Sequence, residues 1–153
     1  MQPYGANRIH AENVIRSLFS NVSILRLQGI VDSSIKKNIL YDIKNNNQLE
    51  KININSSLQF YPLDRLYSDI KIIISNNISL INLSVEPIKI SEIIKKYNIV
   101  LDQKIGSEVV KKNGLVTYNV KSIYAELFGG TGGYIVGKRE STNSIMKYLN
   151  YKI

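Results

Sequence analysis

A tyrosine and an arginine four residues apart, Tyr4 and Arg8, stand near the start of the sequence, in the stretch QPYGANRIHAENVIRSLF (2–19). Residues at this spacing lie one turn apart on the same face of an α-helix, so a phenol and a guanidinium can meet a common ligand. A neighbouring cation stabilises a phenolate and lowers the pKa of a tyrosine, as proton transfer near neutral pH requires. On periodicity alone, an exposed tyrosine above a solvated arginine is the favoured interpretation.

The helix that would carry this pair is predicted over residues 4–19. Its apolar residues recur at helical spacing and give it one apolar face: Ala11, Val14, Ile15 and Leu18. The following segment, NVSILRLQGIVD (21–32), is rich in β-branched and apolar residues, which predicts a buried strand that runs into a loop.

Helices and strands are expected to alternate along the rest of the chain. Helices are predicted at 33–47, with Ser33 or Ser34 as the cap, at 63–77, at 90–98 with Ser91 as the cap, at 122–130 and at 140–153. One or two short strands are predicted within 49–63, where Ile52 and Ile54 alternate with polar residues, and a further strand is predicted at 78–85. Residues 100–117 are compatible with either strand or loop. This alternation favours an α/β fold with parallel strand pairs.

Three other patterns are expected to be structural. GGYIVGKR (132–139) matches G-x-x-x-x-G-K, but Arg139 stands where a phosphate-binding loop needs Ser or Thr, so a turn leading into the last helix is expected. His10 is predicted to lie on the surface. Asp64 and Asp69 are five residues apart, which spreads them around a helix, and Asp69 is expected to cap, pair or be solvated.

Composition limits the function classes. The 153 residues are enough for one domain, and the absence of Cys together with a single His excludes disulfides and makes metal catalysis unexpected. The formal charge of +8 raises the possibility of nucleic-acid binding, but the lysine pairs are scattered and no basic stretch is interleaved with aromatics. No specific nucleic-acid partner is therefore expected. A basic surface binder of nucleic acid remains a third and weaker class.

Neither a membrane span nor a secretion signal is expected. No apolar run approaches the roughly 20 residues that a spanning helix needs, and no charged segment followed by an apolar one opens the chain. The expected location is therefore cytoplasmic.

The letters around Tyr4 and Arg8 carry a family resemblance. PYGANRIHAE (3–12) resembles the PYGxxKxxAE segment of extended short-chain dehydrogenases, the NAD(P)-dependent sugar epimerases and dehydratases, whose YxxxK pair lies on such a helix. Four later segments are similar to family motifs in the family's order: SILRLQGIVD (23–32) to the strand and loop beside the nicotinamide, FYPLDRLYSDIKIII (60–74) to the F-x-x-V-D-D-x-A-x-A helix, INLSVEPIKISEIIKKY (81–97) to the x-N-x-G strand and helix, and SIYAELFG (122–129) to the late K-A-x-x-x-L-G helix.

The resemblance implies a fold and a site. The chain would be the carboxyl-terminal part of a Rossmann-type fold with its small substrate-binding domain, and the segment bearing the glycine-rich turn that cradles the pyrophosphate would precede Met1. Residues 1–153 would form a single partial domain, with 1–32 as the catalytic helix and a late Rossmann strand and 33–153 as the interleaved substrate-binding domain and remaining Rossmann elements. The cofactor would be NAD or NADP, which the isolated chain is not expected to bind, and the substrate a nucleotide-linked sugar.

Site residues also follow from the resemblance. Tyr4 would be the general acid and base and Arg8 its electrostatic partner, and both would contact the cofactor. The four residues after the strand would lie nearest the nicotinamide: Gln28, Gly29, Ile30 and Val31. Arg8 departs from the family, which has lysine there. Arginine keeps the charge but on a longer, planar group.

Two readings of a different class stay open beside the oxidoreductase. The chain could be a truncated, non-catalytic product. It could also be a subunit that docks on a separately encoded amino-terminal half, or that forms a homo-oligomer.

Overall fold

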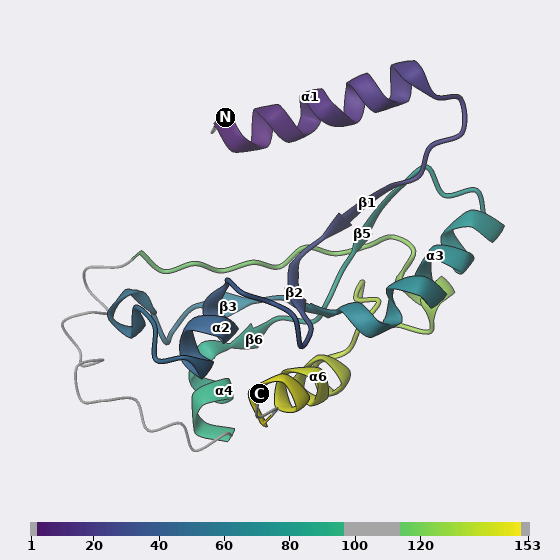
Figure 1. Cartoon of the computed structure of the whole chain (residues 1–153). Helices are drawn as coiled ribbons and strands as arrows, with labels where there is room; N and C mark the ends of the chain where they lie inside the picture. Colours follow the sequence, from purple (N-terminus) through teal and green to yellow (C-terminus); the bar gives the residue numbers. More distant parts are fainter. Residues whose placement is uncertain (1–2, 97–113, 151–153) are drawn as a thin grey trace.

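The computed structural model describes residues 3–96 and 114–150 (Figure 1). Its first element is a single long helix, α1 (Pro3–Leu18), which proline at the first helical position favours because its fixed φ already suits the helix. In Figure 1, α1 lies apart from the other elements and leads through residues 19–23 into the first strand. The expected helix over 4–19 is confirmed.

The strands form three short pairs. β1 (Ile24–Leu27) pairs in parallel with β5 (Leu80–Leu83), and β2 (Gly29–Val31) pairs in parallel with β4 (Phe60–Pro62). β3 (Ser57–Leu58) pairs antiparallel with β6 (Ile88–Lys89). Gln28 lies between β1 and β2, so the chain exchanges one parallel partner for another at this residue. The mixed α/β class and its parallel strand pairs are therefore confirmed.

Four further α-helices and three 3₁₀ turns complete the described structure. The α-helices are α2 (Ile39–Lys44), α3 (Leu66–Ser75), α4 (Ile90–Lys96) and α6 (Lys138–Asn150). The 3₁₀ turns are η1 (Leu49–Lys51), η2 (Leu63–Arg65) and η3 (Ala125–Phe128). Among the helices within 3–96 and 114–150, none is both long and apolar enough to cross a membrane.

Strand β4 separates two hydrophobic clusters. Successive residues of a strand point to opposite faces, and the buried side chains of Phe60 and Tyr61 accordingly belong to different clusters. The Phe60 cluster gathers side chains from β2, α2, α4, β6 and α6, whereas the Tyr61 cluster gathers them from α3, β5 and the 125–136 segment. Ser141 of α6 ties this helix to β4 by donating a hydrogen bond of 2.7 Å from its hydroxyl to the Phe60 carbonyl.

The segment that follows Gly114 is held beside β3 and β4. Ser57 donates its backbone N–H to Val116 and accepts one from Tyr118, each at 2.9 Å. The buried Gln59 side chain accepts a hydrogen bond from the backbone of Val120 at 2.8 Å, and donates to the carbonyls of Val120 at 2.8 Å and Val85 at 2.5 Å. One buried amide thus joins three segments that are distant in sequence.

Two predicted helix caps were wrong. The second helix begins at Ile39, and Asn38 caps it by accepting hydrogen bonds from the backbone of Leu40 and Tyr41. Ser34 is instead engaged with Asp32, to which it donates both its N–H and its hydroxyl, so the chain turns here before it becomes helical. Ser91 lies inside α4, where its N–H donates to the Ile54 carbonyl.

Three predicted elements need correction in their bounds or type. Ile52 and Ile54 lie outside the strands, and the two short strands of this region follow them. The helix expected at 122–130 is only η3, which ends where Gly129 adopts a left-handed φ of 75°. The last helix begins at Lys138, and the turn expected at 132–139 leads into it. Residues 100–113 of the ambiguous stretch lie outside the described residues.

Candidate functional site

Tyr4 and Arg8 lie one turn apart in α1, as predicted. The helix spans both residues without interruption, and the Arg8 side chain is exposed. Gly5, between them, is partly buried, while the positions from Ala6 to Ala11 are exposed. The pair thus lies on a helix most of whose surface is open to solvent.

Glu12 connects this helix to the strand that follows it. The Arg26 guanidinium donates to both oxygens of the Glu12 carboxylate, at 2.8 Å and 2.5 Å. These hydrogen bonds lower the pKa of Glu12, desolvation opposes them, and the charges of Arg26, Arg16 and Arg8 lower it further. Arg8 therefore lies within electrostatic reach of the residue that anchors α1.

A second contact holds the carboxyl end of α1. Arg16 donates a hydrogen bond of 3.1 Å from Nη2 to the backbone carbonyl of Ser79, just before β5. Together with the Glu12–Arg26 ion pair, this contact means that polar side chains attach α1 to the strands. The apolar side chains of α1 do not make these attachments.

Gln28 occupies the point where the chain passes from β1 to β2. Its Oε1 atom is buried and accepts no hydrogen bond from any residue within 3–96 or 114–150. A buried acceptor without a donor costs about 1–3 kcal/mol, so such an atom needs an explanation, for example a water, an ion or a bound group that supplies the donor.

The three residues after Gln28 form β2. Gly29 lies so close to the neighbouring strand that a Cβ there would be 3.0 Å from the Gln59 carbonyl oxygen. The Ile30 carbonyl accepts a hydrogen bond of 3.0 Å from Asn38, and Val31 is buried in the Phe60 cluster. These residues are fixed by packing and are accordingly well suited to position a neighbouring group.

The predicted site residues fall into two separate groups. Figure 1 shows α1, the helix of Tyr4 and Arg8, apart from β2, the strand of Ile30 and Val31. The Glu12–Arg26 pair is the link between α1 and β1. A site that uses both groups would need further protein or ligand between them.

A hollow at the carboxyl ends of β2 and β4 was not predicted. It has a volume of about 170 Å³ and is lined by residues that follow the two strands and by one face of α6: Val31, Asp32, Ser33, Asp64, Ser144, Lys147 and Tyr148. In α/β proteins, ligands bind where parallel strands end. An aspartate placed directly after one strand (IVD) and soon after another (PLD) was the signal in the sequence.

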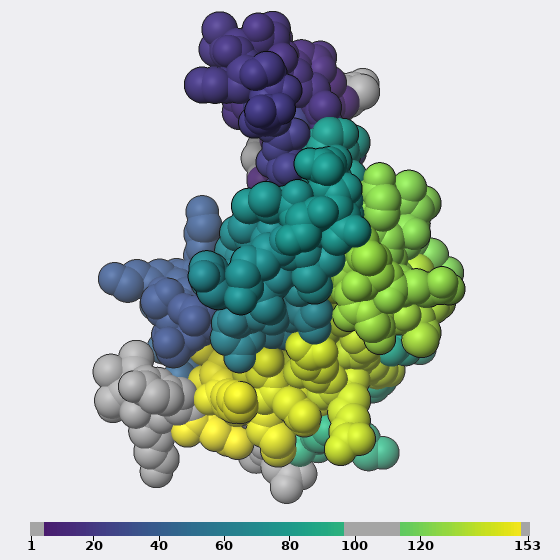
Figure 2. All heavy atoms as spheres, turned by 90° about the vertical axis from the view of Figure 1, so that its right-hand side faces the viewer, coloured from purple at the N-terminus to yellow at the C-terminus, as the bar shows by residue number. Residues whose placement is uncertain are grey.

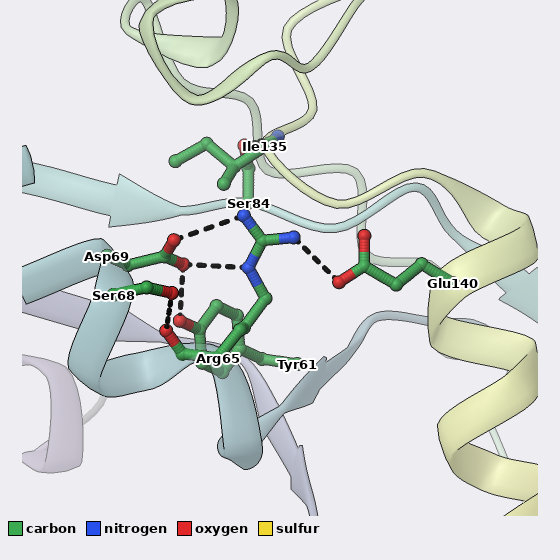
Figure 3. A network of polar contacts seen from close by, with 7 residues as sticks. All are labelled: Tyr61, Arg65, Ser68, Asp69, Ser84, Ile135 and Glu140. Carbon is green, nitrogen blue, oxygen red and sulfur yellow. Dashed lines mark hydrogen bonds and ion pairs between the residues drawn. The ribbon is translucent and has the colours of Figure 1, made fainter.

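A buried polar network lies on the other side of β4 (Figure 3). Asp69 is fully buried and accepts hydrogen bonds from the Tyr61 hydroxyl at 2.5 Å and from Arg65 at 2.9 and 3.1 Å. Arg65 also donates to Glu140 of α6 at 2.7 Å. Burial and the hydrogen bond to Asp69 raise the pKa of Tyr61, so this tyrosine stays protonated. The network joins β4, α3 and α6.

The predicted surface position of His10 is confirmed, and Asp69 is paired, one of the three outcomes expected for it. His10 is exposed on α1, and Asp64 is exposed while Asp69 is paired, so the two aspartates do not form a dyad. Within the described part of the chain, no three His, Asp or Glu side chains gather in a way that could hold a metal ion.

A scan against protein-family models and a search of curated proteins each found no match to this chain.

Proposed function

We propose that this chain is the carboxyl-terminal part of an NAD(P)-dependent oxidoreductase, similar to extended short-chain dehydrogenases, that acts on a nucleotide-linked sugar. One observation carries the proposal: segments chosen for their family motifs pair with one another as parallel strands. β1 and β2, from SILRLQGIVD, pair with β5 and β4, which begin the INLSVEPIKIS and FYPLDRLYS segments. Parallel pairing of non-consecutive strands is typical of sheets that bind dinucleotides.

In this proposal, Tyr4 moves the proton and Arg8 supplies the charge that favours its phenolate form. The i, i+4 spacing of the two positions within α1 supports the pairing, because residues at this spacing share one face of a helix. NAD or NADP would take up or return the hydride when bound. The part of this chain in that step is to hold or release a proton at Tyr4 Oη.

Gln28 is the residue with the best fit to a bound group. Its buried Oε1 needs a donor, and a nicotinamide carboxamide or a substrate hydroxyl could supply one. The packed positions of Gly29 and Val31 keep the strand from moving away from such a group. Within residues 3–96 and 114–150, no glycine-rich turn leads from a named strand directly into a helix, so cofactor affinity would depend on other protein.

Calorimetry on two proteins tests the proposal. The isolated chain should bind neither NAD⁺ nor NADP⁺ measurably. A fusion to the dinucleotide-binding half of an extended short-chain dehydrogenase should bind one of them, and adding UDP-glucose as a representative nucleotide sugar should produce a further heat signal that Gln28→Leu reduces. Saturable micromolar binding by the isolated chain, or none by a folded fusion, would contradict the proposed function.

A second candidate is a non-catalytic docking subunit. Arg8 in place of the family lysine favours it, because a guanidinium does not reproduce the compact ammonium that holds a ribose. This candidate predicts cofactor binding by the fusion without hydride transfer.

A further inference from the structure

Two parallel strands and a helix contribute to the hollow at the carboxyl ends of β2 and β4. Asp32 directly follows β2, and Asp64 lies in η2, which directly follows β4. Helix α6 supplies three further lining residues, Ser144, Lys147 and Tyr148. Figure 2 shows α6, in yellow, beside the teal segment that contains α3. Polar side chains that are distant in sequence therefore converge on one small space.

The apolar part of the lining is firmly held. Val31 and Tyr148 are both buried, and both belong to the Phe60 cluster. Lys44 of α2 donates a hydrogen bond of 2.9 Å to the Tyr148 carbonyl, and its Nζ lies 4.7 Å from the centre of the Tyr148 ring. The hollow thus has the preorganised lining that lowers the entropic cost of binding a small ligand.

Asp32 is held as an ionised acceptor at the edge of β2. Its Oδ1 accepts hydrogen bonds from Ser34, from the N–H at 2.8 Å and from the hydroxyl at 2.5 Å. These hydrogen bonds lower the pKa of Asp32, although desolvation opposes them. A carboxylate offers about four acceptor sites on its two oxygens, so Asp32 keeps capacity for a further donor.

Opposite charges line the hollow without neutralising one another. Within residues 3–96 and 114–150, no ion pair joins Lys147 to Asp32 or to Asp64. Neither Asp64 nor Lys147 has a hydrogen-bond partner among these residues. One ligand with a cation at one end and an anion at the other can satisfy both carboxylates and the ammonium together.

We propose that this hollow binds a small zwitterion, an α-amino acid, whose ammonium donates to Asp32 and Asp64 and whose carboxylate accepts from Lys147. The hydroxyls of Ser33 and Ser144 are further donors and acceptors in the lining. The site uses none of the residues assigned to hydride transfer, so it is independent of the proposed function.

The size and the charges of the lining disfavour other ligands. The volume of about 170 Å³ is below the roughly 300–1,000 Å³ of sites for drug-sized molecules, so a ligand of amino-acid size is expected. A plain anion such as phosphate would meet two carboxylates. A simple amine would leave Lys147 without a partner, and a metal ion would meet its positive charge.

A nuclear magnetic resonance titration of the full 153-residue chain with three matched probes tests the site. L-serine carries both charges, ethanolamine lacks the carboxylate, and 3-hydroxypropionate lacks the ammonium. L-serine should shift the amide signals of Ser33, Ser144 and Lys147 saturably. Each of the other probes should bind about tenfold more weakly or worse, because each loses one charge-assisted interaction.

Two variants assign the ends of the ligand. Asp64→Asn and Lys147→Met change exposed side chains, and each should weaken L-serine binding about fivefold or more. Asp64→Asn should not weaken the binding of 3-hydroxypropionate, and Lys147→Met should not weaken that of ethanolamine. The matched controls are Glu126→Gln and Lys89→Met, which replace an exposed acid and an exposed lysine outside the lining and should change affinity less than about twofold.

Three results would overturn the amino-acid site. They are the absence of saturable shifts with L-serine, binding of ethanolamine or 3-hydroxypropionate as tight as that of L-serine, and losses in the control variants equal to those of Asp64→Asn and Lys147→Met. The titration uses neither a cofactor nor a second polypeptide. Its failure is therefore distinct from a failure of the calorimetry that tests the proposed function.

Discussion

Arg65 holds the fully buried carboxylate of Asp69 one helical turn away, with Nε on one oxygen at 2.9 Å and Nη2 on the other at 3.1 Å. The bidentate geometry satisfies both oxygens, and the Tyr61 hydroxyl adds a third hydrogen bond. A buried carboxylate is tolerated only when it is paired in this way. Tyr61 lies in β4 and Asp69 in α3, so it is the hydrogen bond from Tyr61 that links α3 to β4.

Replacing Asp69 should destabilise the fold strongly. Asp69→Ala leaves the Tyr61 hydroxyl without an acceptor and Arg65 with Glu140 as its remaining partner, which should lower the free energy of unfolding by about 3 kcal/mol. Asp64→Ala is the matched control, because the same side chain is exposed there, and should change the free energy by less than about 0.5 kcal/mol. Urea unfolding followed by circular dichroism measures the free energy of unfolding of each variant. Equal losses for Asp69→Ala and Asp64→Ala would show that the buried network does not stabilise the protein.

The sequence predicted the type of most elements because apolar spacing controls both helix and strand formation. The spacing of apolar residues from Ala11 to Leu18 predicted α1, and ISLINLSV (78–85) predicted β5. The predicted start of α2 was wrong because polar side chains determine where this helix begins. Asn38 caps α2, and Asp32 accepts a hydrogen bond from Ser34 in the turn before it. Such side chain to backbone contacts compete with helix formation and leave no periodic signal.

The attachment of α1 should weaken in acid. The pKa of Glu12 lies below its ordinary value of 4.5, chiefly through the hydrogen bonds from Arg26, so the unfolded chain binds a proton at higher pH than the folded chain does. The stabilisation is therefore complete above about pH 4.5 and is lost as the pH falls through the lowered pKa. The free energies of unfolding of the parent and of Glu12→Gln should differ at neutral pH and converge as the pH falls through the lowered pKa of Glu12. A difference independent of pH would contradict this role.

Gly130 should not tolerate a side chain. A Cβ at this position would lie 2.0 Å from the Tyr134 carbonyl oxygen and 2.9 Å from the Ile135 Cα, both backbone atoms that cannot easily move. Gly130→Ala should therefore lower the free energy of unfolding by about 1–3 kcal/mol or more. A Cβ at Gly137 would meet nothing within 4 Å, so Gly137→Ala is the control for thermal unfolding. Similar melting temperatures for both variants would exclude the close approach.

The candidate site was less predictable than the fold. Tyr4 and Arg8 could be placed on one helix because their separation is local, but the separation of α1 from β2 depends on tertiary packing. The unsatisfied Gln28 oxygen likewise results from three-dimensional burial and has no counterpart in the sequence pattern. Asp69 was expected to cap, pair or be solvated, and only the structure shows which.

Arg8 is the position where a return to the family residue should be informative. In the fusion to a dinucleotide-binding half, Arg8→Lys should keep or raise hydride transfer because it restores a compact ammonium. Arg8→Ala should lower the rate about tenfold or more, since it removes the charge that favours the Tyr4 phenolate. The rate of hydride transfer by each variant is measured from the absorbance of the reduced nicotinamide. Arg8→Ala with the parent rate would remove Arg8 from the site.

The most direct test of the proposed function compares hydride transfer by the parent fusion and by the fusion that carries Tyr4→Phe. Tyr4→Phe keeps the ring but removes the oxygen that transfers the proton, so turnover with a nucleotide sugar should fall about a hundredfold or more while cofactor affinity changes little. Circular dichroism should confirm that both proteins are equally folded. Equal turnover by the parent and Tyr4→Phe would contradict the assignment of Tyr4 as the general acid and base, and with it the account of this chain as part of an oxidoreductase.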